Sequence, residues 1–287
     1  IHFNPNAAFA ARRINKCEQQ SKSLNCVSIA FDYPGVGSSE GEARNTKDLV
    51  KAGIAQVDRL LKQGVPAKSI VLDGQSIGAA VATLVAAHYH KQNPPQQVYL
   101  INGRSFNKLS TETDALIQTM GPEKLSRLKS PKLAKAISLV VGKIAKLAIK
   151  ASGLEIDAGQ AYKSIPDQFK TLYFAQNDEI IPFKASLAKA VGCDQNDPDR
   201  MLLNAGHNDV LDSVLNQRSL TGDQLREKFV ETAFGRKIDF NVELSRSGVT
   251  KRRTSTYEYL NNSKKSMGPD SPAATTTRPK RPKSTKY

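Results

Sequence analysis

The sequence predicts an α/β fold with a mostly parallel central sheet, helices on both faces and an inserted helical cap. In the first half of the chain, short runs rich in β-branched and aromatic residues alternate with longer runs of helical periodicity. This alternation is typical of parallel strands joined by covering helices. A basic helical stretch then interrupts the alternation before it resumes, which indicates an insertion. A chain of 287 residues is long enough for one such domain with an insertion and a tail.

Each element expected in the first half has a local signal. The run Val-Ser-Ile-Ala-Phe at 27–31 predicts a buried strand. Thr46 is suited to capping a helix, because apolar residues recur at helical spacing from Val50 onward and Gly64 then ends the pattern. The other expected elements are the end of a strand at 1–3, a strand at 69–72, a helix at 77–90 and a strand at 97–102.

The second half contains the predicted cap and the end of the domain. Between about 104 and 168 a basic helical stretch stands where the next strand is expected, and we interpret it as the inserted cap. Beyond it we expect a strand at 171–174, a helix at 182–191, a strand at 201–203 and one or two helices within 209–234. The chain therefore divides into a domain over 1–244, which includes the cap, and a tail over 245–287.

The tail is basic and poor in apolar residues, so we expect it to be disordered on its own. Residues 246–287 hold eleven Lys or Arg against Glu258 and Asp270, a net +9 of the chain's +15. Clusters of this kind are suited to anionic lipid, nucleic acid or a localisation or export signal, and a solvated tail is equally open. Only three tyrosines are there to stack on bases, so no specific nucleic-acid recognition is expected.

In the cap, the sequence predicts an amphipathic helix. Leu133, Ile137, Val140, Ile144 and Ala148 fall on one helical face, and lysines crowd the rest. Such a helix is suited to an anionic membrane or an acyl chain. The alternative is a cap helix that packs on the core and presents a solvated lysine face, and the two combine in a lid over an apolar acyl pocket.

Cysteine content and the start of the chain bear on localisation. Cys17, Cys26 and Cys193 make an odd count, which does not predict a disulfide framework. The chain begins at Ile1 without a methionine and already reads as the end of a strand, so we expect upstream sequence to be missing. We predict a cytoplasmic protein, or one exported without a visible signal peptide.

We expect no cofactor. We also expect no metal site, since His88 and His90 lie two apart on a helix, face different directions and so make a poor metal pair.

Ser76 is the candidate nucleophile. It lies at the centre of the motif Gly-Gln-Ser-Ile-Gly at 74–78, between a predicted strand and a predicted helix. Flanking glycines permit the strained turn that lifts a serine clear of a sheet. His207 is the candidate base, because it follows a predicted strand in a loop where parallel sheets display functional side chains. Asp178, directly after the strand at 171–174, is the candidate acid, with Glu179 as its rival.

An attacked carbonyl also needs N–H donors for the charge that develops on its oxygen. One should be the amide of Ile77, directly after Ser76. The second is expected from the loop Asn4-Pro5-Asn6-Ala7. Because Pro5 has no N–H, the donor there is Asn6 or Ala7.

The segment DYPGVGSSEG at 32–41, the motif around Ser76 and the Asp178 and His207 loops together resemble α/β-hydrolases. The resemblance is greatest to the Bem46-like branch, with its palmitoyl-protein thioesterase-like and esterase-like members. It implies that Ser76 is the nucleophile, Asp178 the acid and His207 the base, with the Asn6 and Ile77 amides as oxyanion hole. The family's usual His-Gly before the oxyanion donor is Asn4-Pro5 here.

The resemblance implies a serine hydrolase that cleaves carboxylic ester or thioester bonds, with acyl or lipid-like substrates, through an acyl-enzyme. The alternative is a hydrolase-like binding protein of weak activity, such as a secreted effector that engages a membrane or a host partner. A peptidase fits less well, although the same three side chains can cut amides.

Overall fold

The computed structural model describes residues 1–124 and 131–234, and the side chains at 118–124 and 131–136 lie outside that description. The chain separates into two compact units, Ile1–Phe240 and Asn241–Tyr287. The second unit, on which the prediction of a disordered tail falls, lies outside the described residues. No helix among the described residues is long and apolar enough to cross a membrane.

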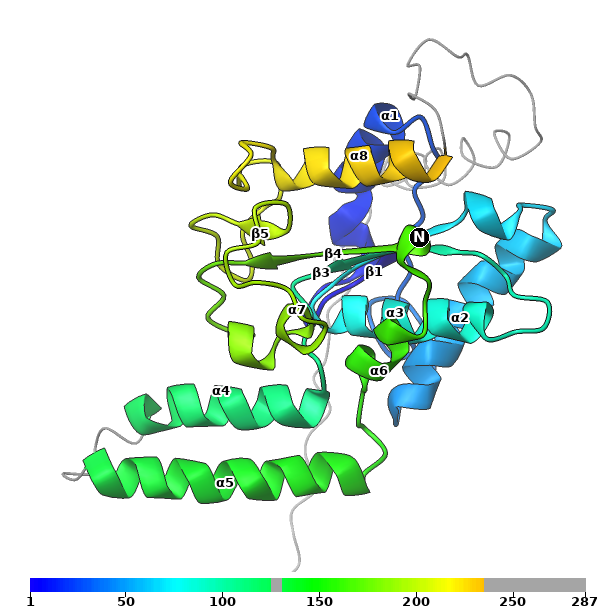
Figure 1. Ribbon diagram of the computed structural model, residues 1–287. Helices are drawn as coiled ribbons and strands as arrows, with labels where there is room; N and C mark the ends of the chain where they lie inside the picture. The colour runs from blue at the N-terminus through cyan, green and yellow to red at the C-terminus, as the bar shows by residue number, and fades with distance from the viewer. Residues whose placement is uncertain (125–130, 235–287) are drawn as a thin grey trace, which may run out of the picture. The chain divides into compact units, whose positions relative to one another are not determined.

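The centre of the first unit is a five-stranded parallel sheet (Figure 1). Its strands lie side by side in the order in which they occur in the chain, and every pair runs parallel. The strands are β1 (His2–Phe3), β2 (Val71–Gln75), β3 (Tyr99–Gly103), β4 (Lys170–Ala175) and β5 (Met201–Leu202). The predicted α/β class with a mostly parallel sheet is therefore confirmed.

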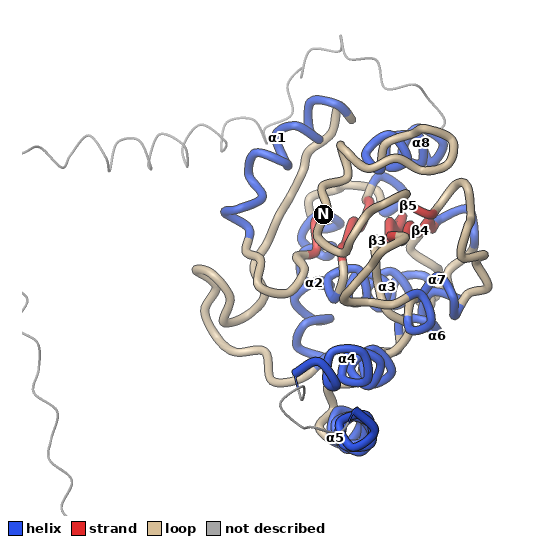
Figure 2. Tube along the Cα trace, turned by 90° about the vertical axis from the view of Figure 1, so that its left-hand side faces the viewer, coloured by secondary structure: helices blue, strands red, loops and turns tan. Residues whose placement is uncertain are grey.

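Helices cover both faces of this sheet (Figures 1 and 2). One face carries α1 (Ile14–Ser23) and α8 (Gly222–Phe234), and the other carries α2 (Thr46–Lys62), α3 (Ile77–His90) and α6 (Ala158–Lys163). The shorter elements are η1 (Ala10–Arg13), η2 (Ala67–Ser69), η3 (Asp167–Phe169), η4 (Phe183–Ala185) and α7 (Leu187–Ala190).

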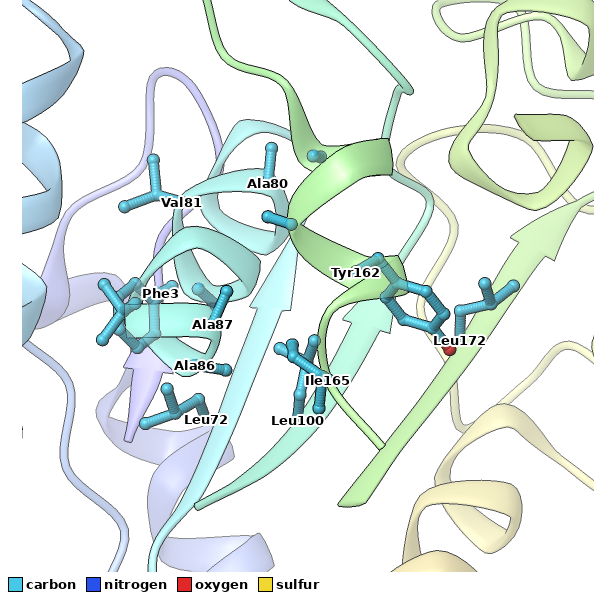
Figure 3. Close-up of a cluster of buried hydrophobic side chains, with 14 of the residues drawn as sticks. Phe3, Leu72, Ala80, Val81, Ala86, Ala87, Leu100, Tyr162, Ile165 and Leu172 are labelled. Carbon is cyan, nitrogen blue, oxygen red and sulfur yellow. The ribbon is translucent and has the colours of Figure 1, made fainter. Parts of the chain in front are cut away.

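Side chains along each strand alternate between the two hydrophobic clusters, because successive residues of a strand point to opposite faces. Leu72, Leu100 and Leu172 are buried in the cluster on the α3 side (Figure 3). Ile101 and Tyr173 belong to the cluster that contains Val230 of α8. The sheet is thus covered by apolar contacts on both faces, which fixes the positions of its strand ends.

Several predicted elements differ from the observed ones. The run 27–31 forms only a single bridge, Ala30 to His2, since β1 is two residues long and offers little to pair with. Asn45, not Thr46, caps α2, and its side chain accepts from the amide of Asp48. The helix predicted at 182–191 is split into η4 and α7 by Ser186, which has an extended backbone.

Near the chain ends, the prediction of one or two helices within 209–234 is confirmed, whereas the first helix of the chain is a difference. Between 209 and 234 only one helix, α8, is present, because the segment before it is held by the bridges of Asn216 to Leu202 and of Leu215 to Thr221. Helix α1 was not expected from the sequence. Gln20 is its one buried residue, so it has no buried apolar stripe.

The predicted cap region contains two different structures. Helices α4 (Leu109–Lys124) and α5 (Pro131–Ala151) pack against each other as a hairpin, and α5 lies farthest from the sheet (Figures 1 and 2). The following α6 instead contacts α3, and its Ala158, Ala161 and Tyr162 are buried in the main core. The part of 104–168 that protrudes from the domain is therefore the α4–α5 hairpin.

Candidate active site

Ser76 stands on a strained turn between β2 and α3. Its backbone has φ 57° and ψ −130°, in a region that side-chain-bearing residues rarely adopt. A Cβ on Gly74 would collide with the backbone of Ala79, and one on Gly78 would collide with the backbone of Phe3 and Asn4. The two glycines of the motif are therefore required by close backbone approach.

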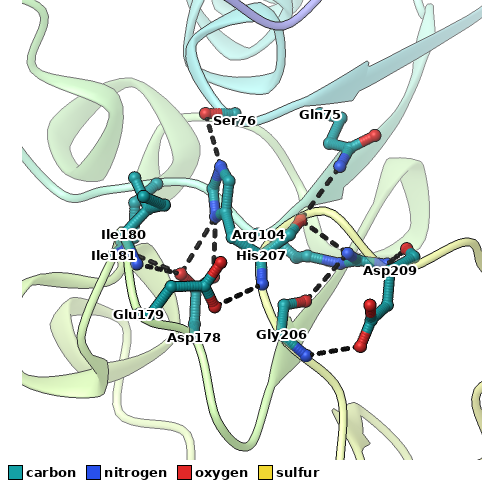
Figure 4. A network of polar contacts seen from close by, with 10 residues as sticks. All are labelled: Gln75, Ser76, Arg104, Asp178, Glu179, Ile180, Ile181, Gly206, His207 and Asp209. Carbon is teal, nitrogen blue, oxygen red and sulfur yellow. Dashed lines mark hydrogen bonds and ion pairs between the residues drawn. The ribbon is translucent and has the colours of Figure 1, made fainter.

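The structure brings Ser76, His207 and Asp178 together at the carboxyl ends of the strands (Figure 4). The Ser76 Oγ lies 2.9 Å from His207 Nε2. The other ring nitrogen, Nδ1, lies 2.9 and 3.0 Å from the two carboxylate oxygens of Asp178. A proton on Nδ1 that is donated to Asp178 leaves Nε2 free to accept the Ser76 hydroxyl. All three side chains are buried or nearly so.

Asp178 and Glu179 have separate positions in this loop. Asp178 accepts from the amides of Ile180 and Ile181 through Oδ1, at 3.0 and 2.7 Å, and so its carboxylate is fixed behind the imidazole. Glu179 accepts from the backbone N–H of His207 at 3.0 Å. Asp178 is therefore the carboxylate that orients the ring, and Glu179 holds the backbone that carries it.

Arg104 was not identified as a site residue from the sequence, yet it anchors the His207 loop. It directly follows β3, and its guanidinium is almost completely buried. Nη1 donates to the carbonyl oxygens of Gly206 and His207 at 3.0 and 2.6 Å, and Nη2 donates to that of Asp209 at 2.5 Å (Figure 4). The signal that could have identified it is its place after a strand of a parallel sheet, where functional side chains gather.

Gln75 and Asp209 complete the support of this loop. Gln75, the residue before Ser76, donates from Nε2 to the carbonyl oxygen of His207 at 3.1 Å. The carboxylate of Asp209 accepts from the amide of Gly206 at 2.8 Å. The carbonyl oxygen of His207 thus accepts two hydrogen bonds, one from Gln75 at the end of β2 and one from Arg104 after β3. These bonds fix the backbone of His207 and so help to hold its ring in one orientation.

The predicted oxyanion donors come from the residue after Ser76 and from the loop after β1. Ile77 is the first residue of α3, so its amide has no acceptor within that helix. Phe3 is in register with Gly74, which brings the loop after β1 to the level of the serine turn. In that loop the amide of Ala7 donates to the side chain of Asn6 at 3.0 Å. Because the Ala7 amide is already engaged by this contact, the amide of Asn6 is the candidate in this loop that stays available to donate to an oxyanion.

Glu112 brings a buried carboxyl from the cap toward the same region. It lies in the first turn of α4 and is 8% exposed. Burial raises the pKa of Glu112 to about 7, while His207 nearby lowers it and Asp178 raises it. A neutral Glu112 at mildly acidic pH avoids a second buried negative charge beside Asp178.

The remaining histidines lie outside this arrangement. His88 contacts Gln92 and His90 contacts the carbonyl oxygen of Val98, whereas His2 lies 3.4 Å from Asp73. Among the described residues, no group of three or more His, Cys, Asp or Glu side chains is placed to hold a metal ion.

A parallel sheet, a serine on a strained strand-to-helix turn, and an acid and a histidine on the loops after two later strands define the α/β-hydrolase fold. No protein-family model matches this chain, and no curated protein matches it in sequence. Solved structures resemble it in the path of the backbone. An α/β-hydrolase from Vibrio vulnificus has 16% identity and a TM-score of 0.47 over 82% of this chain and 72% of that one.

Two further structures are similar. A monoacylglycerol lipase from Paleococcus ferrophilus has 16% identity and a TM-score of 0.47, and covers 82% of this chain and 93% of its own. The thioesterase domain from the curacin biosynthetic pathway has 14% identity and a TM-score of 0.40, and covers 72% and 85%. What the present site can do chemically follows from its own residues.

Proposed function

We propose that this protein is a serine hydrolase that cleaves carboxylic ester or thioester bonds, with acyl or lipid-like substrates, through an acyl-enzyme. The observation that carries the proposal is the contact of Ser76 Oγ with His207 Nε2 at 2.9 Å, with Asp178 bonded to the opposite ring nitrogen. A hydroxyl becomes a competent nucleophile when a base of this kind takes its proton as it attacks.

The reaction has two halves. Ser76 Oγ attacks the carbonyl carbon while its proton passes to His207 Nε2, and Asp178 stabilises the resulting imidazolium. The amides of Ile77 and Asn6 supply hydrogen bonds to the carbonyl oxygen as it becomes negative. Collapse expels an alcohol or thiol, which takes the proton from His207. Water, deprotonated by His207, then attacks the acyl-enzyme. The acyl–Oγ bond breaks, the carboxylic acid leaves, and His207 returns the proton to Ser76 Oγ.

We further infer, from the resemblance of the segment 32–41 and the site motifs to that family, that the chain belongs to the branch with palmitoyl-protein thioesterase-like and esterase-like members. The side chain of Asp32 accepts from the amide of Ala10 at 2.6 Å. A Cβ on Gly37 would collide with the same carboxylate, and Gly37 has φ +60°. The motif thus builds a loop around Asp32, consistent with a structural part of the fold rather than with a second set of reacting groups.

The test is hydrolysis of p-nitrophenyl esters and acyl thioesters of increasing acyl length by the full chain. We expect turnover that S76A abolishes, with the chain length of the best substrate separating a long-chain acyl hydrolase from a short-chain esterase. A folded protein that hydrolyses none of these substrates, and that does not react with a fluorophosphonate, would overturn the proposal. That result would favour a hydrolase-like binding protein.

A further inference from the structure

The outer helix of the cap, α5, packs through small residues. Ser138 and Gly142 are buried, and a Cβ on Gly142 would collide with Asp114 of α4. These positions are four apart and therefore lie on one helical face. Close contact at Gly142 fixes which side of α5 is turned to α4, and hence which side is turned to solvent.

The side turned to solvent carries the large apolar residues. Val140, Ile144 and Leu147 are 56%, 64% and 70% exposed, and Val141 beside them is 47% exposed. They follow one another at spacings of three and four, so they form a continuous stripe along the helix. Most soluble amphipathic helices turn such a stripe toward the core, and a contiguous exposed apolar surface of this kind indicates an interaction site.

Charge on the same side indicates the kind of partner. Lys143 and Lys150 are exposed and lie along one edge of the stripe. Between 131 and 151 the sequence contains no Asp or Glu. An apolar stripe bordered by cations matches an anionic lipid surface, where acyl chains meet the apolar side chains and headgroups meet the ammonium groups. One alternative predicted from the sequence was a cap helix that packs its apolar face on the core and exposes its lysines. That alternative is wrong for Val140, Ile144 and Leu147, which are exposed.

The alternative occupants fit this charge less well. A second copy of the chain, docked stripe to stripe, would bring the Lys143 and Lys150 side chains of both copies to one interface. The chain's own segment 246–287 carries a net charge of +9 and would meet the same cations. Like charges brought together in this way disfavour association.

We propose that α5 docks the protein on an anionic bilayer, lying in the plane of the surface with Val140, Ile144 and Leu147 inserted and Lys143 and Lys150 at the headgroups. This inference goes beyond hydrolysis and does not depend on the reactivity of Ser76. Since α4 and α5 form one hairpin, docking through α5 would bring the first turn of α4, with Glu112, to a fixed orientation relative to the membrane.

The test is co-sedimentation of the full chain with vesicles of phosphatidylcholine alone and of phosphatidylcholine with about a third phosphatidylserine. The variant I144D/L147D should lose binding to both kinds of vesicle, by at least about tenfold on the anionic ones. K143E/K150E should lose at least about tenfold only where phosphatidylserine is present, because each lysine near such a surface contributes about fivefold. The matched control is I14D/V27D, which places the same two charges at exposed apolar positions on other elements and should bind like the wild type.

Thermal melts must show that all variants are folded, which is expected because every substituted side chain is exposed. Wild-type binding by I144D/L147D would overturn the proposal and assign lipid binding to another surface. Failure of the wild type to sediment with either vesicle would overturn it as well. A dimer in analytical ultracentrifugation that I144D/L147D converts to a monomer, without vesicle binding, would assign the stripe to contact between copies instead.

Discussion

Replacing Arg104 with methionine should slow the reaction while leaving substrate binding nearly unchanged. The guanidinium is almost completely buried and donates to three carbonyl oxygens of the His207 loop, those of Gly206, His207 and Asp209. Methionine fills a similar volume and donates nothing, so these oxygens lose their buried donor. Gln75 still donates to the His207 carbonyl at 3.1 Å, which keeps the loop close to its place.

The size of the effect follows from these contacts. A hydrogen bond from a charged donor contributes about 1.5–3 kcal/mol, and part of this is offset because the buried charge itself is removed. We therefore expect the free energy of unfolding to fall by about 3 kcal/mol. A displacement of His207, the proposed base, by about 1 Å should lower the rate by about 100-fold. The expected result is a kcat about 100-fold lower with KM within about threefold of the wild-type value.

The assay is steady-state hydrolysis of the best p-nitrophenyl ester, with the rate of fluorophosphonate labelling as a second readout. R104K, which keeps a charge but has no planar fork, should be intermediate. Methylguanidine added to R104A should restore part of kcat, a response that a merely destabilised protein would not give. The surface control R218M should behave like the wild type. A folded R104M with unaltered kcat would refute the assignment of Arg104 as the residue that positions His207.

Three further predictions concern carboxylates and their partners. D178N should lower kcat about 10⁴-fold, because the amide no longer favours the required tautomer of His207, whereas E179Q should cost less than about tenfold. E112Q should leave the free energy of unfolding nearly unchanged at about pH 4 and raise it by about 3 kcal/mol at pH 8. R226L should lower the free energy of unfolding by about 3–5 kcal/mol, because Asp73 is left buried without the Arg226 guanidinium.

The first of these compares neighbouring acids by kcat. E179Q retains an oxygen that can accept from the His207 amide, so it is a matched control for D178N. Equal losses in the two variants would contradict the assignment of Asp178 to the ring.

The sign for Glu112 follows from its pKa, which burial raises to about 7 from an ordinary value of 4.5. The folded protein therefore holds this proton more tightly than the unfolded chain, and stability falls as pH rises from about 4.5 to about 7. Glutamine is neutral throughout and lacks this loss. Urea denaturation at both pH values measures it, and the exposed E42Q should show no such difference. A parallel pH dependence in wild type and E112Q would count against the placement of Glu112.

For R226L the reason is the ion pair between Arg226 of α8 and Asp73 of β2, at 2.9 Å and buried at both ends. Burial alone would raise the pKa of Asp73, but Arg226 and His2 hold it well below its usual range. Urea denaturation measures the loss, and R44L, which breaks the exposed pair with Glu42, should change stability by less than about 1 kcal/mol. Equal losses of unfolding free energy in R226L and R44L would contradict a larger contribution of the buried pair than of the exposed one.

The elements and residues that the sequence identified share a local signal. The helix at 77–90 has the predicted bounds, since its apolar and alanine-rich pattern is continuous and a strand and Pro94 bracket it. Ser76 could be found because its glycines are required by backbone contacts within a few residues or with the neighbouring strand. Asp178 and His207 could be found because each lies in the loop that follows a strand of the sheet.

The residues that the sequence did not identify depend on contacts between distant segments. Arg104 bonds to carbonyl oxygens 102 to 105 residues further along the chain, and backbone acceptors of this kind leave no trace in the types of residue present. Glu112 appears as an ordinary charge in a helix until the packing of α4 buries it. In α5 the helical periodicity was evident from the sequence, but the side that faces solvent was not. The small residues Gly142 and Ser138 decide which face of the helix meets α4.

The most direct test of the central claim is to label the folded protein with a fluorophosphonate and to identify the modified residue by peptide mass spectrometry after digestion. We predict a single phosphonyl adduct on Ser76, formed at a rate that H207Q lowers by at least about 100-fold and that S76A abolishes. An adduct at another residue, or labelling of Ser76 that is equally fast in H207Q, would contradict the claim that His207 activates this serine.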